Sequence, residues 1–232
     1  MNIISMPSPN FDERDEKDIK YIILHYTGMQ SAEDAFARLC DQSSEVSAHY
    51  TVDEEGKIYQ HVNEEHRAWH AGKSAWQNDH SLNKNSIGIE IVNPGHEFGY
   101  VPFPKEQINA VIDLCKKIQI DHDIEYVLGH SDVAPERKLD PGELFPWQTL
   151  AQNGIGEWPS ISSEDMVKCG SMDIYTALKD FGYRADHKEN ALLAFQRHFV
   201  PEAFEKEAQG YVCSLTKGRL YALLASHLIN SQ

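Results

Sequence analysis

Two apolar stretches of this chain each end in a histidine, and they constrain its fold more than any other feature. Residues 21–27 (YIILHYT) carry His25 near their end, and residues 124–128 lead to His130. Short apolar runs rich in β-branched residues are typical of buried strands. In sheet proteins, ligands gather at the carboxyl ends of strands. The two histidines are therefore candidates for one site, although more than a hundred residues separate them.

The segment after the second histidine is polar and is punctuated by prolines. It carries Asp140, and Pro135 and Pro141 bracket its charged part. Proline fixes φ, so we expect this loop to hold a defined shape. Two histidines and one carboxylate provide three metal ligands and leave one position of a tetrahedral zinc ion open, which is the pattern of catalytic zinc sites. The alternative interpretation is a surface turn.

Five motifs occur in order along the first two thirds of the chain. They are LHYTG around His25, SAHY at 47–50, AWHAG at 68–72, SIGIEIVN at 86–93 and GHSDVAPERKLDPG at 129–142. Together they resemble the zinc-dependent N-acetylmuramoyl-L-alanine amidases of the amidase_2 and peptidoglycan recognition protein-like family. The likeness is greatest to the AmiD-type branch, which carries a C-terminal peptidoglycan-binding domain. It covers about residues 19–160 and extends less specifically into the C-terminal third.

This resemblance implies a fold, a reaction and a set of site residues. The fold is α/β, with a central mixed β-sheet flanked by helices, followed by a small all-α domain of three helices. The reaction is hydrolysis of the amide between the lactyl group of N-acetylmuramic acid, or its anhydro form, and L-alanine of the stem peptide of peptidoglycan or its fragments. One Zn²⁺ per chain is expected on His25, His130 and Asp140, with Glu90 and Lys138 catalytic and Thr27, His49 and His70 in contact with substrate.

Glu90 lies on a strand predicted over residues 86–93. Side chains alternate along a strand, so its isoleucines face one way while Gly88 and Glu90 face the other. On an outer strand Glu90 would face solvent. On a central strand flanked by the two histidine-bearing strands it would point into the cleft, with room left beside it by Gly88. The resemblance places the family's catalytic glutamate here and favours the second interpretation.

Lys138 lies two residues before Asp140, and residues two apart in an extended loop share a side. Its ammonium group could therefore stabilise an oxyanion over the same cleft. A solvent-exposed lysine is the alternative, and the match of RKLDPG to the family motif favours the catalytic role. For His49 and His70, substrate contact and a hydrogen-bonded structural role stay equally open.

The remaining elements divide the chain into three parts. Residues 1–18 are expected to form a tail or strap, residues 19–160 the catalytic domain and residues 161–232 a helical domain. The first domain is expected to contain helices over 31–40 and 105–119 and a hairpin from 49–52 and 57–62, and the second to contain helices over 171–181, 189–200 and 216–230, the last capped by Thr216. The helical domain either binds peptidoglycan or only packs on the catalytic domain.

Composition limits the partners and the compartment. A net charge of −15 over 232 residues argues against nucleic acid, which needs a basic surface. The chain has no apolar run long enough to cross a bilayer. Residues 1–18 lack the features of a secretory signal, which predicts the cytoplasm, with the periplasm or cell envelope as the alternative. The four cysteines contain no CxxC pair and are predicted to be reduced.

Two other functions compete with the amidase. A non-catalytic peptidoglycan recognition protein would share the fold, but such proteins typically lack a zinc ligand. A non-haem iron oxygenase also uses two histidines and one carboxylate. Such enzymes are expected to take their carboxylate from a His-x-Asp pair, whereas the carboxylate predicted here, Asp140, lies ten residues after His130.

Overall fold

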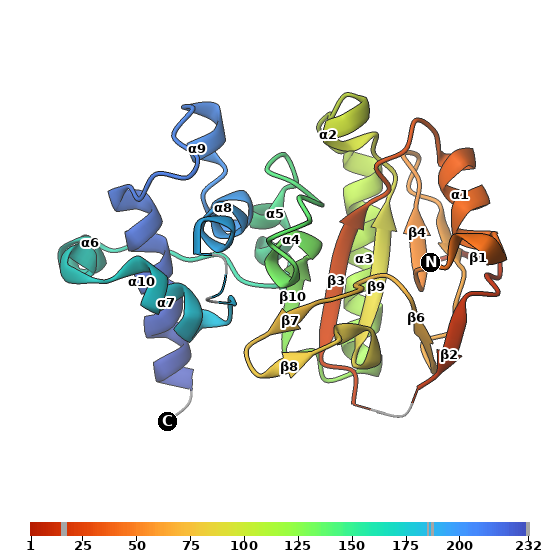
Figure 1. The fold of residues 1–232 in the computed structure, drawn as a ribbon, viewed down its shortest axis with the longest axis horizontal. Coiled ribbons are helices and arrows are strands. Elements are labelled where there is room, and N and C mark those ends of the chain that lie inside the picture. Colours follow the sequence, from red (N-terminus) through yellow and green to blue (C-terminus); the bar gives the residue numbers. More distant parts are fainter. Residues whose placement is uncertain (15–17, 185, 187, 231–232) are drawn as a thin grey trace.

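Six strands form one mixed sheet in the order β1-β5-β4-β9-β3-β10 (Figure 1). The computed structural model describes residues 1–14, 18–184, 186 and 188–230. Neighbouring strands are parallel except for the antiparallel pair β4-β5. The bounds are Ile3–Ser5 (β1), Tyr21–Tyr26 (β3), Tyr50–Val52 (β4), Ile58–Gln60 (β5), Ser86–Ile91 (β9) and Tyr126–Gly129 (β10). The predicted α/β class and mixed sheet are confirmed.

The two faces of the sheet pack against different partners. Ile22 and Leu24 of β3 join the isoleucines of β9 in one core with helix α3, Lys105–Asp121, which lies behind the sheet in Figure 1. Tyr21 and Ile23 belong to a second core on the other face. Because strand side chains alternate, His25 and Glu90 lie on this second face, away from α3.

Helix α1, Ala32–Cys40, begins where the sequence predicts. The Oγ atom of Ser31 accepts a hydrogen bond from the backbone N of Asp34 at 3.1 Å, which satisfies one of the free N–H groups of the first turn. The predicted hairpin also forms, from β4 and β5.

The N-terminal segment is part of the fold rather than a tail. β1 pairs with β5 at the edge of the sheet, and β2, Phe11–Glu13, pairs with β6, His66–Ala68. The guanidinium group of Arg14 then donates to five backbone carbonyl oxygens, those of Glu64, His66, Asn83, Lys84 and Ser86. Residues 1–14 are therefore a strap that fixes the segment 64–86. Residues 15–17 of the predicted tail lie outside the described residues.

Several short elements have no counterpart in the prediction. They contain two to six residues each, too few to show a periodic pattern. These are η1 (Gln42–Ser44), β7 (Ala75–Trp76), β8 (Asp79–His80), η2 (Leu82–Lys84), α2 (Gly95–Phe98), α4 (His130–Val133), α5 (Trp147–Gln152), α6 (Ser163–Lys168), η3 (Cys169–Ser171) and α9 (Glu202–Glu205).

The three helices predicted in the C-terminal part are present. They are α7 (Ile174–Phe181), α8 (Lys188–Phe199) and α10 (Ser214–Asn230). The prediction that Thr216 caps the last helix is wrong, because α10 begins two residues earlier. Thr216 is fully buried, and its Oγ1 atom accepts a hydrogen bond from Nε2 of Gln196 at 3.2 Å.

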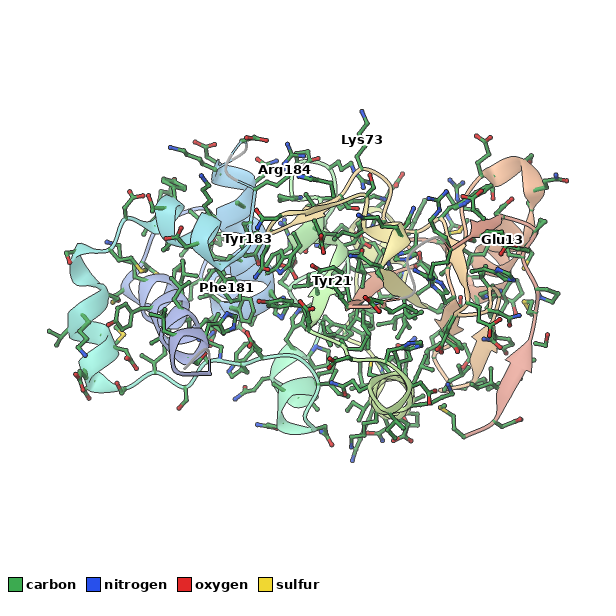
Figure 2. All side chains as sticks on the ribbon, turned by 90° about the horizontal axis from the view of Figure 1, so that it is seen from below. Glu13, Tyr21, Lys73, Phe181, Tyr183 and Arg184 are labelled. Carbon is green, nitrogen blue, oxygen red and sulfur yellow. The ribbon has the colours of Figure 1, made fainter. Side chains whose placement is uncertain are left out.

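The C-terminal helices share a core with the sheet. They lie beside the β10 edge, at the opposite end of the sheet from β1 (Figure 1). Tyr21 and Trp76 of the first part pack in one cluster with Phe181, Tyr183 and Phe195 of the second. Figure 2 shows Tyr21, Phe181 and Tyr183 along the junction. One hydrophobic core therefore contains residues from both sides of the predicted boundary near residue 160.

The structure also bears on the cysteines and on membrane-spanning segments. All four cysteines are free thiols. Among the described residues, no helix combines the length and the apolar character needed to span a bilayer.

Candidate active site

The three predicted metal ligands come together at the carboxyl edge of the sheet. β3 delivers His25, and β10, its parallel neighbour, leads directly into His130. Nδ1 of His25 lies 2.9 Å from Nδ1 of His130, and Oδ2 of Asp140 lies 3.1 Å from each of these nitrogens. All three residues are buried. Their spacing is close to the ~3.3 Å that separates ligands around a tetrahedral zinc ion with bonds of about 2.0–2.1 Å.

The protonation of His130 follows from its outer nitrogen. Nε2 lies 3.2 Å from the carbonyl oxygen of Ala71, which can only accept, so Nε2 carries the hydrogen. Nη2 of Arg137 lies 3.3 Å from the same nitrogen, but it donates to the carbonyl oxygens of Ala71 and Lys73, at 2.5 and 2.8 Å. In a neutral ring, Nδ1 of His130 then presents a lone pair to the site.

The protonation of His25 follows from a chain of three hydrogen bonds. The hydroxyl of Ser86 donates to the carbonyl oxygen of Leu82 at 2.6 Å, so its oxygen accepts from Nε2 of His70 at 3.2 Å. Nδ1 of His70 therefore has a lone pair, which accepts from Nε2 of His25 at 3.1 Å. Burial, and next the charge of His130, lower the pKa of His25 to about 4, so the ring is neutral at neutral pH. Nδ1 of His25 presents a lone pair as well.

When both rings are neutral, as ligation of a metal requires, three electron-pair donors converge with no hydrogen between them. Two imidazole nitrogens and a carboxylate oxygen repel one another at about 3 Å unless a cation lies among them. The outer nitrogens of both rings are held by hydrogen bonds, which is how proteins orient histidines that ligate metals. This donor set fits a divalent metal ion, and two nitrogens with one oxygen suit zinc.

Glu90 lies next to this group, on the strand β9. The register pairs Glu90 with His25, and its Oε2 atom is buried with no hydrogen-bond partner among the described residues. Burial, and next the charge of Asp140, raise the pKa of Glu90 to about 8, against the opposing charges of Lys138 and Arg38. The side chain points into the cleft, as expected for a central strand.

Two details of that expectation are wrong. β9 lies between β4 and β3, whereas β10, which leads to His130, is on the far side of β3. Gly88 makes room for His70 and not for Glu90, because a Cβ atom at position 88 would lie 2.4 Å from Cγ of His70.

A cavity of about 670 Å³ opens above the three predicted ligands. Glu90 and Lys138 line it, and the Lys138 side chain is partly buried. Thr27 also lines it, where its Oγ1 donates to the carbonyl oxygen of Asn93 at 3.2 Å. Of the described residues around the cavity, Arg38 and Arg137 were not singled out by the sequence. Arg137 stands inside the motif at 129–142 and could have been found there, whereas nothing in the helix pattern marks Arg38.

The two remaining histidines have different positions. His70 lines the cavity but is only 9% exposed, and it holds His25. His49 is fully buried and is not among the residues around the cavity; its Nδ1 accepts from the backbone N of Gly88 at 3.0 Å, and its Nε2 donates to the carbonyl oxygen of His66 at 3.1 Å. This place does not fit the predicted contact with substrate and matches the alternative, a hydrogen-bonded structural histidine.

Known proteins have sequences similar to that of this chain. The family model described as N-acetylmuramoyl-L-alanine amidase matches residues 15–143. The N-acetylmuramoyl-L-alanine amidase AmiD of Escherichia coli is 35% identical over 230 residues, covering 87% of this chain and 82% of the relative. The 1,6-anhydro-N-acetylmuramyl-L-alanine amidase AmpD of Haemophilus influenzae is 31% identical over 61% of this chain and 86% of its own.

Solved structures of two relatives cover almost the whole chain. The structure of Escherichia coli AmiD, in complex with anhydro-N-acetylmuramic acid-L-Ala-D-gamma-Glu-L-Lys, superimposes with a TM-score of 0.78 at 32% identity, over 94% of this chain and 98% of the other. The structure of AmpDh3 from Pseudomonas aeruginosa, in complex with an anhydromuramic pentapeptide, gives a TM-score of 0.79 at 29% identity, over 95% of both chains. The likeness therefore includes the C-terminal helices.

Proposed function

The chain belongs to the N-acetylmuramoyl-L-alanine amidase family, and we propose that it is a zinc hydrolase that cleaves the amide between the lactyl group of N-acetylmuramic acid and L-alanine of the stem peptide. The observation that carries this proposal is the convergence of lone pairs from His25, His130 and Asp140 beside the unpartnered carboxylate oxygen of Glu90. A peptidoglycan recognition protein that only binds would not need this pair of features.

His25 and His130 would hold the metal through Nδ1, and Asp140 through Oδ2. Zinc supplies a Lewis acid for the amide carbonyl and makes water nucleophilic near neutral pH. A single carboxylate among the three ligands leaves a net positive charge at the site. The hydrogen bonds from Nε2 of each ring keep both histidines in the tautomer that this role requires.

Glu90 is the general base and then the general acid. Its Oε2 atom has no partner among the described residues, so it is free to take a proton from the attacking water and deliver it to the departing nitrogen of L-alanine. A raised pKa suits both steps, because a base whose pKa lies near the working pH can accept and release a proton.

Lys138 stabilises the negative charge that develops on the carbonyl oxygen. Its ammonium group belongs to a partly buried side chain on the wall of the same cavity, where charges are screened less than in water. Asp140 follows two residues later, so one loop would supply both a metal ligand and the cation.

The substrate is a muropeptide, in the normal or the anhydro form of the sugar. Two similar structures contain anhydromuramyl peptides, and the cavity of about 670 Å³ falls in the range of pockets that hold small ligands. The scissile amide would lie above the three ligands, between Glu90 and Lys138.

Mass spectrometry of the products tests this proposal. The zinc-loaded protein is incubated with purified muropeptides in both sugar forms, with a chelated sample as the control. The expected result is release of free stem peptide beginning at L-alanine, abolished by the chelator. Intact muropeptides, with the protein still retained on peptidoglycan, would instead indicate a binding protein. Cleavage of another bond would refute the roles given to Glu90 and Lys138.

A further inference from the structure

A buried carboxylate connects the C-terminal helices to the proposed metal site. Asp132 lies two residues after His130, in the four-residue helix α4, and is 1% exposed. Its Oδ2 atom accepts from the backbone N of Gly129 at 2.7 Å. Asp132 thus binds the end of β10 at the residue that precedes a proposed ligand.

Both oxygens of this carboxylate also accept hydrogen bonds from side chains of the C-terminal part. The hydroxyl of Tyr183 donates to Oδ1 at 2.6 Å, and Nδ1 of His198 donates to Oδ2 at 2.7 Å. A buried carboxylate without donors is strongly unfavourable. Besides the backbone N–H of Gly129, this carboxylate has donors from Tyr183 and His198, which lie 51 and 66 positions further along the chain.

The two donors are themselves held in place. The ring of His198 stacks on Trp147 with centroids 3.6 Å apart, and the ring of Tyr183 packs edge-on against Trp76 at 4.9 Å. Neither Tyr183 nor His198 is among the residues that line the cavity above the metal ligands. These two residues therefore do not contact the cavity directly, and their hydrogen bonds to Asp132 link them to the site.

The backbone around Asp132 packs closely against the segment that carries Asp140. A Cβ atom placed on Gly129 would lie 2.9 Å from Cδ of Pro141 and 3.3 Å from Oδ2 of Asp132. The backbone N of Ser131 donates to the carbonyl oxygen of Asp140 at 2.9 Å. A shift of Asp132 would therefore move both His130 and Asp140.

From these contacts we infer that Tyr183 and His198 are positioning residues for the metal ligands. The C-terminal part, through Tyr183 after α7 and His198 in α8, sets the geometry of His130 and Asp140 by way of the carboxylate of Asp132. This inference rests on the proposed metal site and adds a role for the C-terminal part that requires no contact with substrate. Groups that hydrogen-bond a metal ligand directly typically change metal affinity by 10- to 100-fold when they are replaced, and Tyr183 and His198 act one contact further out, so we expect the lower end of this range.

The test measures affinity for Co²⁺ by competition with a chromophoric chelator, together with the visible spectrum of the Co²⁺ protein and thermal unfolding of the metal-free protein. Tyr183→Phe removes one hydroxyl, and His198→Phe removes the donor while keeping a ring to stack. Tyr21→Phe is the matched control, since it loses a similar bond, to Asp79 at 2.7 Å, within the same core. His198→Asn returns an N–H donor at the position of Nδ1.

We expect the dissociation constant for Co²⁺ to rise about tenfold or more in Tyr183→Phe and His198→Phe, with an altered spectrum, and to recover partly in His198→Asn. Tyr21→Phe should lower thermal stability and leave Co²⁺ affinity unchanged. Tyr183→Phe carries the test if His198→Phe does not fold. Affinities within twofold of the wild type in both variants would overturn the inference. Failure of the wild type to bind Co²⁺ would overturn the metal site itself, and this inference with it.

Discussion

The Nε2 atom of His25 lies 3.1 Å from the Nδ1 atom of His70, and this single contact fixes which nitrogen of His25 faces the proposed metal. His70 can accept there only because its own Nε2 hydrogen is directed to Ser86. The ring of His70 in turn occupies the space over Gly88. The glycine of the IGIE motif, the histidine of AWHAG and the histidine of LHYTG are thus parts of one support.

Gly88→Ala tests this support. The added methyl group would lie 2.4 Å from Cγ of His70, so the ring must move and the hydrogen bond to His25 is lost. We expect metal affinity to fall by roughly 10- to 100-fold, measured by competition with a chelator. Gly170→Ala is the control, because its Cβ atom would meet nothing within 4 Å. Equal metal affinity in the two variants would show that the position of His70 over Gly88 does not orient His25.

Glu90→Gln tests the general base. The amide keeps the shape of the side chain but cannot take a proton, so we expect turnover to fall by about 10²- to 10⁴-fold with zinc content unchanged. Glu97→Gln serves as the control. Glu97 lines the same cavity but belongs to helix α2, whereas Glu90 pairs with His25 in the sheet. Turnover in Glu90→Gln close to that of the control would remove Glu90 from the mechanism.

Glu90 should also make the metal-free protein sensitive to pH. Burial raises its pKa from 4.5 to about 8, so between these values the folded protein binds more protons than the unfolded chain. Stability must then fall as the pH rises through this window. Glu90→Gln removes the titration, and we expect it to raise the melting temperature above pH 8 and to have little effect below pH 4.5. Parallel melting curves for variant and wild type, recorded across this range in chelator, would contradict the raised pKa.

Asp140→Ala tests the ligand set. With two histidines left, we expect the protein to lose stoichiometric zinc and its activity. Zinc should raise the melting temperature of the wild type through mass action and leave that of the variant unchanged. Asp113→Ala, at an exposed position of α3, should behave as the wild type in both measurements. Normal zinc content in Asp140→Ala would refute the assignment.

The sequence was sufficient to predict the central strands and the residues that meet at their ends. The apolar runs of β3, β9 and β10 are strong local signals, and parallel pairing of β3 with β10 brings His25 beside His130. It could not predict that β1 joins the sheet, because pairing of Ile3–Ser5 with β5 depends on contacts more than fifty residues apart.

The residues that hold the site residues in place could not be predicted from local sequence patterns, because they too depend on contacts between distant parts of the chain. Asp132 is one of several acids in a polar loop, and nothing near it shows that Tyr183 and His198 will bind it. His49 and His70 look alike in their motifs, but only the packed structure places one in the core and the other at the cavity.

A crystal structure of the zinc-loaded protein, with anomalous data recorded at the zinc absorption edge, would show whether His25, His130 and Asp140 hold the metal. We expect one anomalous peak about 2.0–2.2 Å from each of three atoms, Nδ1 of His25, Nδ1 of His130 and Oδ2 of Asp140. The carboxylate of Glu90 should lie beside that peak without ligating it. A peak at Nε2 of either histidine, or none among the three residues, would contradict it.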